Sequence, residues 1–181
     1  MYISRFLSIR NMANGNTNNE ATAHFSKVKF GSNNMAFTLV IDTGSSDTWT
    51  PSDTCWSCAC LAPKRYGTKA STTLVKTMRT FSIQYGSGQV EGTIVSDSVW
   101  FAGFNTNISF GMATRVSDEF IYFPVDGITG LGFQNASTQK VQTIMDDIFV
   151  FEDSSTKIVF LTLICNVIPG DVAQDRDPAH P

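Results

Sequence analysis

The sequence predicts an all-β domain that carries one short helix near residues 137–149. Short runs in which apolar and polar residues alternate recur between Phe25 and Met112, as expected of strands with one buried face. Gly-containing turns separate these runs, and one stretch shows apolar residues at helical spacing. Repeated short strands with such turns are typical of a barrel or a sandwich.

The composition fits a single packed domain and argues against two kinds of partner. The 181 residues are 42% apolar and 16% charged, which suits a globular core. The net charge is −3 and no basic run occurs, so we expect no nucleic-acid partner. The longest apolar run, Ile158–Ile168, is shorter than the roughly 20 residues of a membrane-spanning helix, so we expect no membrane partner.

Changes in composition and in the apolar pattern near both ends divide the chain into three predicted parts. Residues 1–22 are polar and rich in Asn without a period, which indicates a loosely ordered lead-in. Residues 23–150 hold the strand and helix signals and form the predicted domain. Residues 151–181 depart from this pattern, which indicates a divergent or disordered tail.

The first two strand segments differ in their expected burial. In the segment HFSKVKF, Val28 and Phe30 alternate with Lys27 and Lys29, which predicts a half-buried strand. The segment FTLVI, residues 37–41, is a continuous apolar run apart from its Thr. Such a run predicts a strand that is buried on both faces.

A β-hairpin is predicted next. The segment FSIQY places Phe81, Ile83 and Tyr85 on one face of a strand. The turn 86–88 interrupts this strand, and a second strand follows from about residue 89 to 95. Alternation continues farther along at these apolar positions: Val99, Phe101, Ile108, Phe110 and Met112.

The helical signal lies close to the end of the predicted domain. Its four apolar residues fall at positions i, i+3, i+4 and i+7 and form one stripe. They are Val141, Ile144, Met145 and Ile148. Asn135 or Ser137 is a candidate N-cap, which would start the helix near residue 137.

An acidic residue follows the apolar run 37–41 directly. Gly44 allows the chain to turn sharply after Asp42, and Thr43 and Ser45 supply hydroxyl groups. A carboxylate that accepts hydrogen bonds in such a turn is held in one orientation and favours its ionised form. It is then suited to general acid or base chemistry on water. By themselves these residues favour an ordinary β-turn that contains an Asp.

Three segments in order resemble the pepsin-like aspartic endopeptidases. FTLVIDTGSSDTWTPS resembles the first active-site segment of that family, with matches at Asp42, Thr43, Gly44, Ser45, Trp49 and Pro51. FSIQYGSGQVEG resembles the hairpin that closes over bound peptide, the flap, with its tip at Tyr85, Gly86, Ser87 and Gly88. VDGITGLGF, residues 125–133, resembles the segment that crosses the active-site loop.

The resemblance implies a fold, a reaction and a set of roles. It implies the barrel lobe of a pepsin-like acid protease and hydrolysis of peptide bonds by water that a pair of carboxylates activates. Thr43 and Ser45 would orient Asp42, the Tyr85 hydroxyl would meet the indole N–H of Trp49, and the tip 86–88 would bind substrate amides. A further set would line an apolar pocket, although core packing explains it equally well: Phe120, Val125 and Ile128.

The cysteines are clustered. The resemblance implies a disulfide between Cys55 and Cys60, with Cys58 as a competitor between them. A zinc site at these three residues is the alternative, but a second cluster with ligand spacing is missing. We expect neither a metal nor another cofactor, and free thiols at Cys58 and Cys165.

The second carboxylate of the expected pair has no counterpart in this sequence. A second Asp-Thr-Gly or Asp-Ser-Gly does not occur, and Asp126 belongs to the crossing segment. Asp42 is therefore the sole member of the pair that we identify. The chain would act on peptide or protein substrates together with a second protease lobe or as a weak homodimer. The alternatives are a non-catalytic peptide-binding module and an inactive truncated fragment.

The resemblance also implies a compartment. Pepsin-like proteases are secreted or lysosomal, and we expect the same here, although no signal peptide is visible in this sequence.

Overall fold

A computed structural model describes residues 9–13, 21–69, 71–86, 88–122 and 125–150. The predictions for Ser87, Cys165 and the tail 151–181 lie outside these residues. The chain divides into two units, Met1–Asp147 and Ile148–Pro181, and the fold described below is that of the first, together with residues 148–150 at the end of its short helix. The division into parts at residues 22 and 150 stays a prediction.

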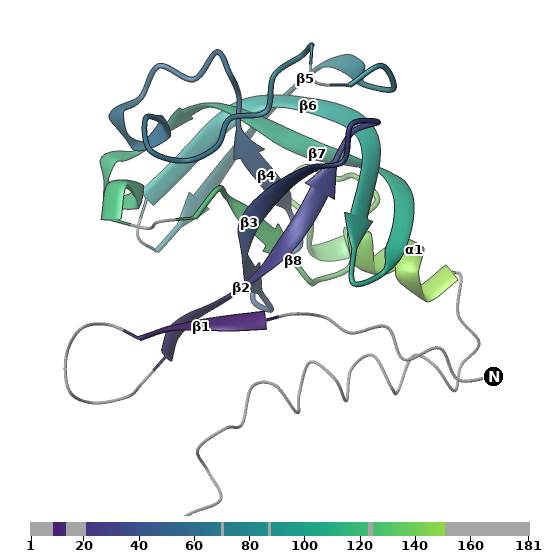
Figure 1. The fold of residues 1–181 in the computed structure, drawn as a ribbon, viewed down its shortest axis with the longest axis horizontal. Coiled ribbons are helices and arrows are strands. Elements are labelled where there is room, and N and C mark those ends of the chain that lie inside the picture. The colour runs from purple at the N-terminus through teal and green to yellow at the C-terminus, as the bar shows by residue number, and fades with distance from the viewer. Residues whose placement is uncertain (1–8, 14–20, 70, 87, 123–124, 151–181) are drawn as a thin grey trace, which may run out of the picture. The chain divides into compact units, whose positions relative to one another are not determined.

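The described residues form one sheet that closes into a barrel (Figure 1). The strand order is β1-β2-β3-β8-β4-β7-β6-β5. Because β2 also pairs with β6, the ring consists of β2, β3, β8, β4, β7 and β6. The strands are β1 Ile9–Ala13, β2 Ala21–Phe30, β3 Met35–Asp42, β4 Thr48–Pro51, β5 Val75–Tyr85, β6 Gly88–Phe101, β7 Phe104–Val116 and β8 Ile128–Gly130. The predicted all-β barrel with little helix is confirmed.

Strand β3 corrects one prediction. Phe37 and Leu39 are fully buried, whereas Thr38 and Val40 are half-buried, so the strand is not buried on both faces. A strand in a closed barrel turns alternate side chains to the inside. The apolar Val40 on the other face lines a surface cavity instead, which explains the continuous apolar run.

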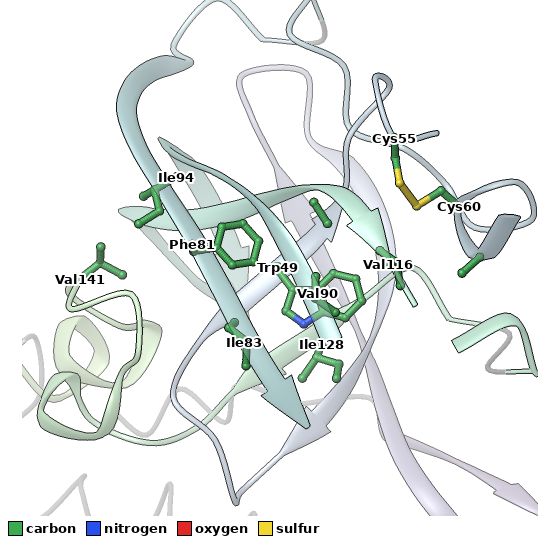
Figure 2. Packing of buried hydrophobic residues seen from close by; sticks show 12 residues of the cluster. Trp49, Cys55, Cys60, Phe81, Ile83, Val90, Ile94, Val116, Ile128 and Val141 are labelled. Carbon is green, nitrogen blue, oxygen red and sulfur yellow. A yellow bond between two sulfur atoms is a disulfide. The ribbon is translucent and has the colours of Figure 1, made fainter. Parts of the chain in front are cut away.

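Two groups of side chains fill the interior. One is aromatic and consists of Phe30, Phe37, Tyr66 and Phe110, whose ring centroids lie 4.6–5.9 Å apart. The other gathers around Trp49, with Phe81 and Ile83 from the predicted hairpin beside it (Figure 2). Strand β6 runs unbroken to Phe101, past residue 95 where the sequence suggested an end.

The short helix is present, but it begins later than predicted. α1 covers Ile144–Val150, and Thr143 caps it: Asp146 donates its N–H to the Thr143 hydroxyl, and Thr143 donates its N–H to the Asp146 carboxylate. Lys140 has a φ of 52°, which is incompatible with an α-helix, so the helix cannot extend back through this residue.

The described residues also form three 3-10 turns: η1 Cys58–Cys60, η2 Asp118–Tyr122 and η3 Gln134–Ala136. In the described part of the chain, no helix is long and apolar enough to cross a membrane.

Candidate active site

Asp42 is the last residue of β3, where the strand leaves the barrel wall. Parallel pairing with β8 places it opposite Gly130, and its carbonyl accepts the N–H of Leu131 at 2.9 Å. Its carboxylate accepts the N–H of Gly44 at 2.9 Å and is partly exposed. The turn that the sequence predicted therefore holds the acid in a fixed place within reach of solvent.

The segment after β8 crosses this turn closely. Gly130 donates its N–H to the carbonyl of Asp47 at 3.1 Å, and Gly132 donates to the carbonyl of Ser45 at 2.9 Å. A Cβ atom at Gly130 would lie 2.5 Å from the carbonyl carbon of Ser46. A glycine is therefore required at this crossing, because any side chain would push the Asp42 loop away.

The two predicted supporting hydroxyls lie in different surroundings. Thr43 is exposed, whereas the hydroxyl of Ser45 is buried and has no hydrogen-bond partner in the part of the chain that is described. The contact that orients the carboxylate in this structure comes from the backbone of Gly44. The roles of Thr43 and Ser45 stay predictions.

A second acid in the same loop was missed in the sequence. Asp47 is buried, and its carboxylate accepts hydrogen bonds from the hydroxyls of Ser137 and Thr138. It also accepts the N–H of Thr138 at 2.9 Å and that of Gln139 at 3.2 Å. These bonds fix the loop from its far end. They also occupy Ser137, which explains why that residue does not cap the helix.

A hydrogen bond between Tyr85 and Trp49 joins the hairpin β5–β6 to β4, the strand that follows the Asp42 loop. The indole N–H of Trp49 donates to the Tyr85 hydroxyl at 2.9 Å. Burial raises the pKa of Tyr85, the Trp49 hydrogen bond opposes this in part, and the negative charge of Asp42 adds to it. The hydroxyl therefore stays protonated and can donate a hydrogen bond of its own.

An apolar cavity opens beside these two side chains. The three residues predicted to line a pocket, Phe120, Val125 and Ile128, all line it. The ring of Phe120 stands edge-on to both Trp49 and Tyr85, with centroids 5.8 and 5.9 Å apart. The remaining lining residues are Val40, Trp49, Pro51, Ala59, Pro63, Tyr85, Val116 and Gly127.

Comparison with known proteins decides the family. The family of eukaryotic aspartyl proteases matches residues 23–161. This chain belongs to the eukaryotic aspartyl protease family. A probable aspartic-type endopeptidase CTSD of Arthroderma benhamiae is 40% identical over 125 residues, which are 68% of this chain and 25% of that protein. Pepsin A of Suncus murinus is 35% identical over 128 residues, which are 70% of this chain and 33% of that protein.

A longer match extends toward the end of the chain. Pepsin A of Callithrix jacchus is 35% identical over 151 residues, which are 82% of this chain and 39% of that protein. This aspartyl protease chain therefore spans between about a quarter and two fifths of the length of these relatives.

Two glycines of the hairpin in this aspartyl protease chain, Gly86 and Gly88, differ in what they require. Gly86 is exposed and a Cβ atom added there would meet nothing within 4 Å. Gly88 has a φ of 150°, which favours glycine. Behind the tip, Gln89 and Ser117 are joined twice: the Gln89 N–H donates to the Ser117 hydroxyl at 2.9 Å, and the Ser117 N–H donates to the Gln89 carbonyl at 3.0 Å.

The disulfide of this aspartyl protease chain confirms the predicted pairing. Cys55 and Cys60 are bonded and buried, and they lie beside the Trp49 group (Figure 2). Cys58 is free and exposed. The alternative zinc site is excluded for these cysteines because two of the three thiolates are used in the disulfide. No group of three potential metal ligands occurs within the described residues.

Proposed function

We propose that this chain is one lobe of an aspartic endopeptidase and that Asp42 supplies one of the two carboxylates that activate water. The observation that carries the proposal is the position of Asp42. Its carboxylate is held by the Gly44 N–H and is open to solvent. Trp49, in the strand that follows this loop, donates its indole N–H to the Tyr85 hydroxyl beside an apolar cavity. Membership of a family of endopeptidases supports the reaction class.

The proposed reaction needs two carboxyl groups in opposite protonation states. Asp42, or its partner, removes a proton from water while the water oxygen attacks the carbonyl carbon of the peptide bond. The other group, protonated, donates to the carbonyl oxygen, which gives a tetrahedral diol. The C–N bond then breaks as the carboxyl group that took the proton from water passes it to the amide nitrogen, while the carboxylate takes back a proton from the diol. Two carboxylates that share a site cannot both be ionised, and this separates the roles. A second lobe or a second copy of the chain supplies the partner group.

The proposed substrate is a peptide or protein that lies between the Asp42 loop and the hairpin. The cavity lined by Phe120, Val125 and Ile128 takes a bulky apolar side chain. The exposed backbone of Gly86 pairs with the amides of the substrate. The same role is proposed for Ser87 from the sequence alone. We also propose a secretory or lysosomal location, which the buried Cys55–Cys60 disulfide favours.

Binding and turnover measured together test the proposal. The ligand is a peptide mimic with a non-hydrolysable hydroxyethylene centre, and the substrate is an internally quenched peptide at acidic pH. We expect Asp42→Asn to weaken binding of the mimic about tenfold, since a hydrogen bond to a charged group is lost. The control is Asp118→Asn at an exposed acid, which should change nothing.

The dependence of turnover on chain concentration distinguishes a site completed by a second copy of the chain from one that requires a second lobe. If a second copy completes the site, hydrolysis should rise with the square of the chain concentration. If a second lobe is required, the chain alone should bind the mimic without cleaving the peptide. Asp42→Asn that cleaves or binds as well as the unaltered chain would overturn the role of Asp42. The peptide-binding module would gain support from binding that is insensitive to this substitution.

A further inference from the structure

Glu119 lies where the hairpin tip meets the rim of the cavity. A Cβ atom at Gly88 would lie 3.3 Å from the Oε2 atom of Glu119 and 3.0 Å from the ring of Phe120. Phe120 lines the apolar cavity, and Glu119 precedes it in η2 with an exposed side chain. A carboxylate is therefore located beside the opening of an otherwise apolar cavity.

Two neighbouring donors act on this carboxylate. The backbone N–H of Glu119 itself and then the hydroxyl of Ser117 hold the pKa of Glu119 below its usual range. The Ser117 hydroxyl also accepts the N–H of Gln89 at 2.9 Å, so this hydroxyl links the carboxylate to strand β6. The Ser117 hydroxyl therefore connects the surroundings of Glu119 to the base of the hairpin.

No Lys or Arg among the described residues forms an ion pair with the Glu119 carboxylate. Across the described residues, the ion pair within 4.0 Å joins Arg115 and Glu91, and η2 carries no basic residue in its last turn. A carboxylate at the rim of an apolar cavity complements a side chain with a long apolar stem and a cationic end. Lysine and arginine have this form.

We propose that Glu119 lets the cavity accept a lysine or arginine side chain of the peptide in addition to bulky apolar side chains. The stem of that side chain packs against the ring of Phe120, and its cationic end meets the Glu119 carboxylate. The inference rests on the proposed function, because it assigns a substrate preference to the same cleft. Glu119 is a specificity residue in this scheme, and Ser117 positions it.

Paired ligands test this preference on the full chain. Two hydroxyethylene mimics carry either lysine or norleucine next to the central group, on each side in turn, so that they differ in the ammonium group. The measured quantity is the ratio of their dissociation constants. We expect Glu119→Gln to reduce the preference for lysine about two- to fivefold, the range of an exposed ion pair. Asp118→Asn, one residue away, should leave the ratio unchanged.

Two further variants make the outcome decisive. Ser117→Ala should reduce the lysine preference while binding of the norleucine mimic is retained. Glu119→Lys should lower the preference below that of Glu119→Gln, because it repels the ligand. Binding of the norleucine mimic with a lysine ratio that does not respond to Glu119→Gln would overturn this inference and leave the proposed function standing. Failure of both mimics to bind the unaltered chain would overturn both.

Discussion

Thr138 donates its backbone N–H to the buried carboxylate of Asp47 at 2.9 Å, although 91 residues separate them. The bond joins the loop that carries Asp42 to the segment that follows β8. Asp47 therefore supports the loop that carries Asp42 without lining the apolar cavity. Its partners all belong to this chain, so contacts within the chain hold the loop in place.

Replacement of Asp47 by Asn should destabilise the fold by about 1–3 kcal/mol. The amide NH2 would face donors of Ser137, Thr138 or Gln139, and a buried donor would lose its acceptor. The measurement is the free energy of unfolding from urea titration. Asp118→Asn is the matched control on an exposed acid. Unchanged stability would show that the Asp47 network does not hold the loop.

Replacement of Tyr85 by Phe should leave the Trp49 indole N–H buried without its acceptor. We expect a loss of about 1–3 kcal/mol in unfolding free energy. The ring contact with Phe120 remains, so the apolar cavity should persist. Trp49 emission, read in a background without Trp56 and Trp100, should shift when its hydrogen bond is lost. An unaltered emission spectrum would contradict the contact.

Replacement of Gly130 by Ala should place a methyl group against the backbone of Ser46 and Asp47. Since these atoms belong to the main chain and cannot rotate away, we expect destabilisation by about 1–3 kcal/mol. Thermal unfolding measures this effect. Gly86→Ala is the control, because the added atom meets nothing there. Equal melting temperatures for both variants would contradict the close crossing.

Replacement of both Cys55 and Cys60 by Ser should cost about 2 kcal/mol, the loop-closure entropy expected for so short a loop. Cys58→Ser should keep the disulfide and the stability of the unaltered chain. Peptide mapping without reductant identifies the pairing. A fragment that links Cys58 to either partner would show that the competing disulfide forms.

Tyr66 should make stability fall at alkaline pH. It is buried and donates to Asp97 at 2.7 Å, and burial, followed by this bond, raises its pKa. The unfolded chain releases the Tyr66 proton above about pH 10, whereas the folded chain retains it. The stabilising contribution is therefore complete below pH 10 and declines above it. Tyr66→Phe should make this decline shallower in unfolding titrations, and an unaltered slope would contradict the assignment.

Local patterns in the sequence identified the parts of the site that depend on neighbours along the chain. The turn at Asp42, the pair Cys55–Cys60 and the face of the hairpin that carries Tyr85 each follow from short spacings or from a family resemblance. The all-β barrel followed from repeated alternation.

Features that depend on distant contacts could not be predicted. Asp47 lies in a polar run and shows no sign that its partners are Ser137 and Thr138. The helix start was misplaced because Ser137 is a good N-cap by type but is used by Asp47 instead. Thr143, three residues before Asp146, was the cap signal that was overlooked.

The parallel pairings of β3 with β8 and of β4 with β7 have a consequence for synthesis of the chain. Asp42 leaves the ribosome long before Gly130 and Thr138, which hold its loop. During that interval β3 has only its antiparallel neighbour β2 to pair with. The segment with Asp42 is therefore synthesised early but takes its final shape late, so a nascent chain halted before β8 would display the Asp42 motif without a formed loop.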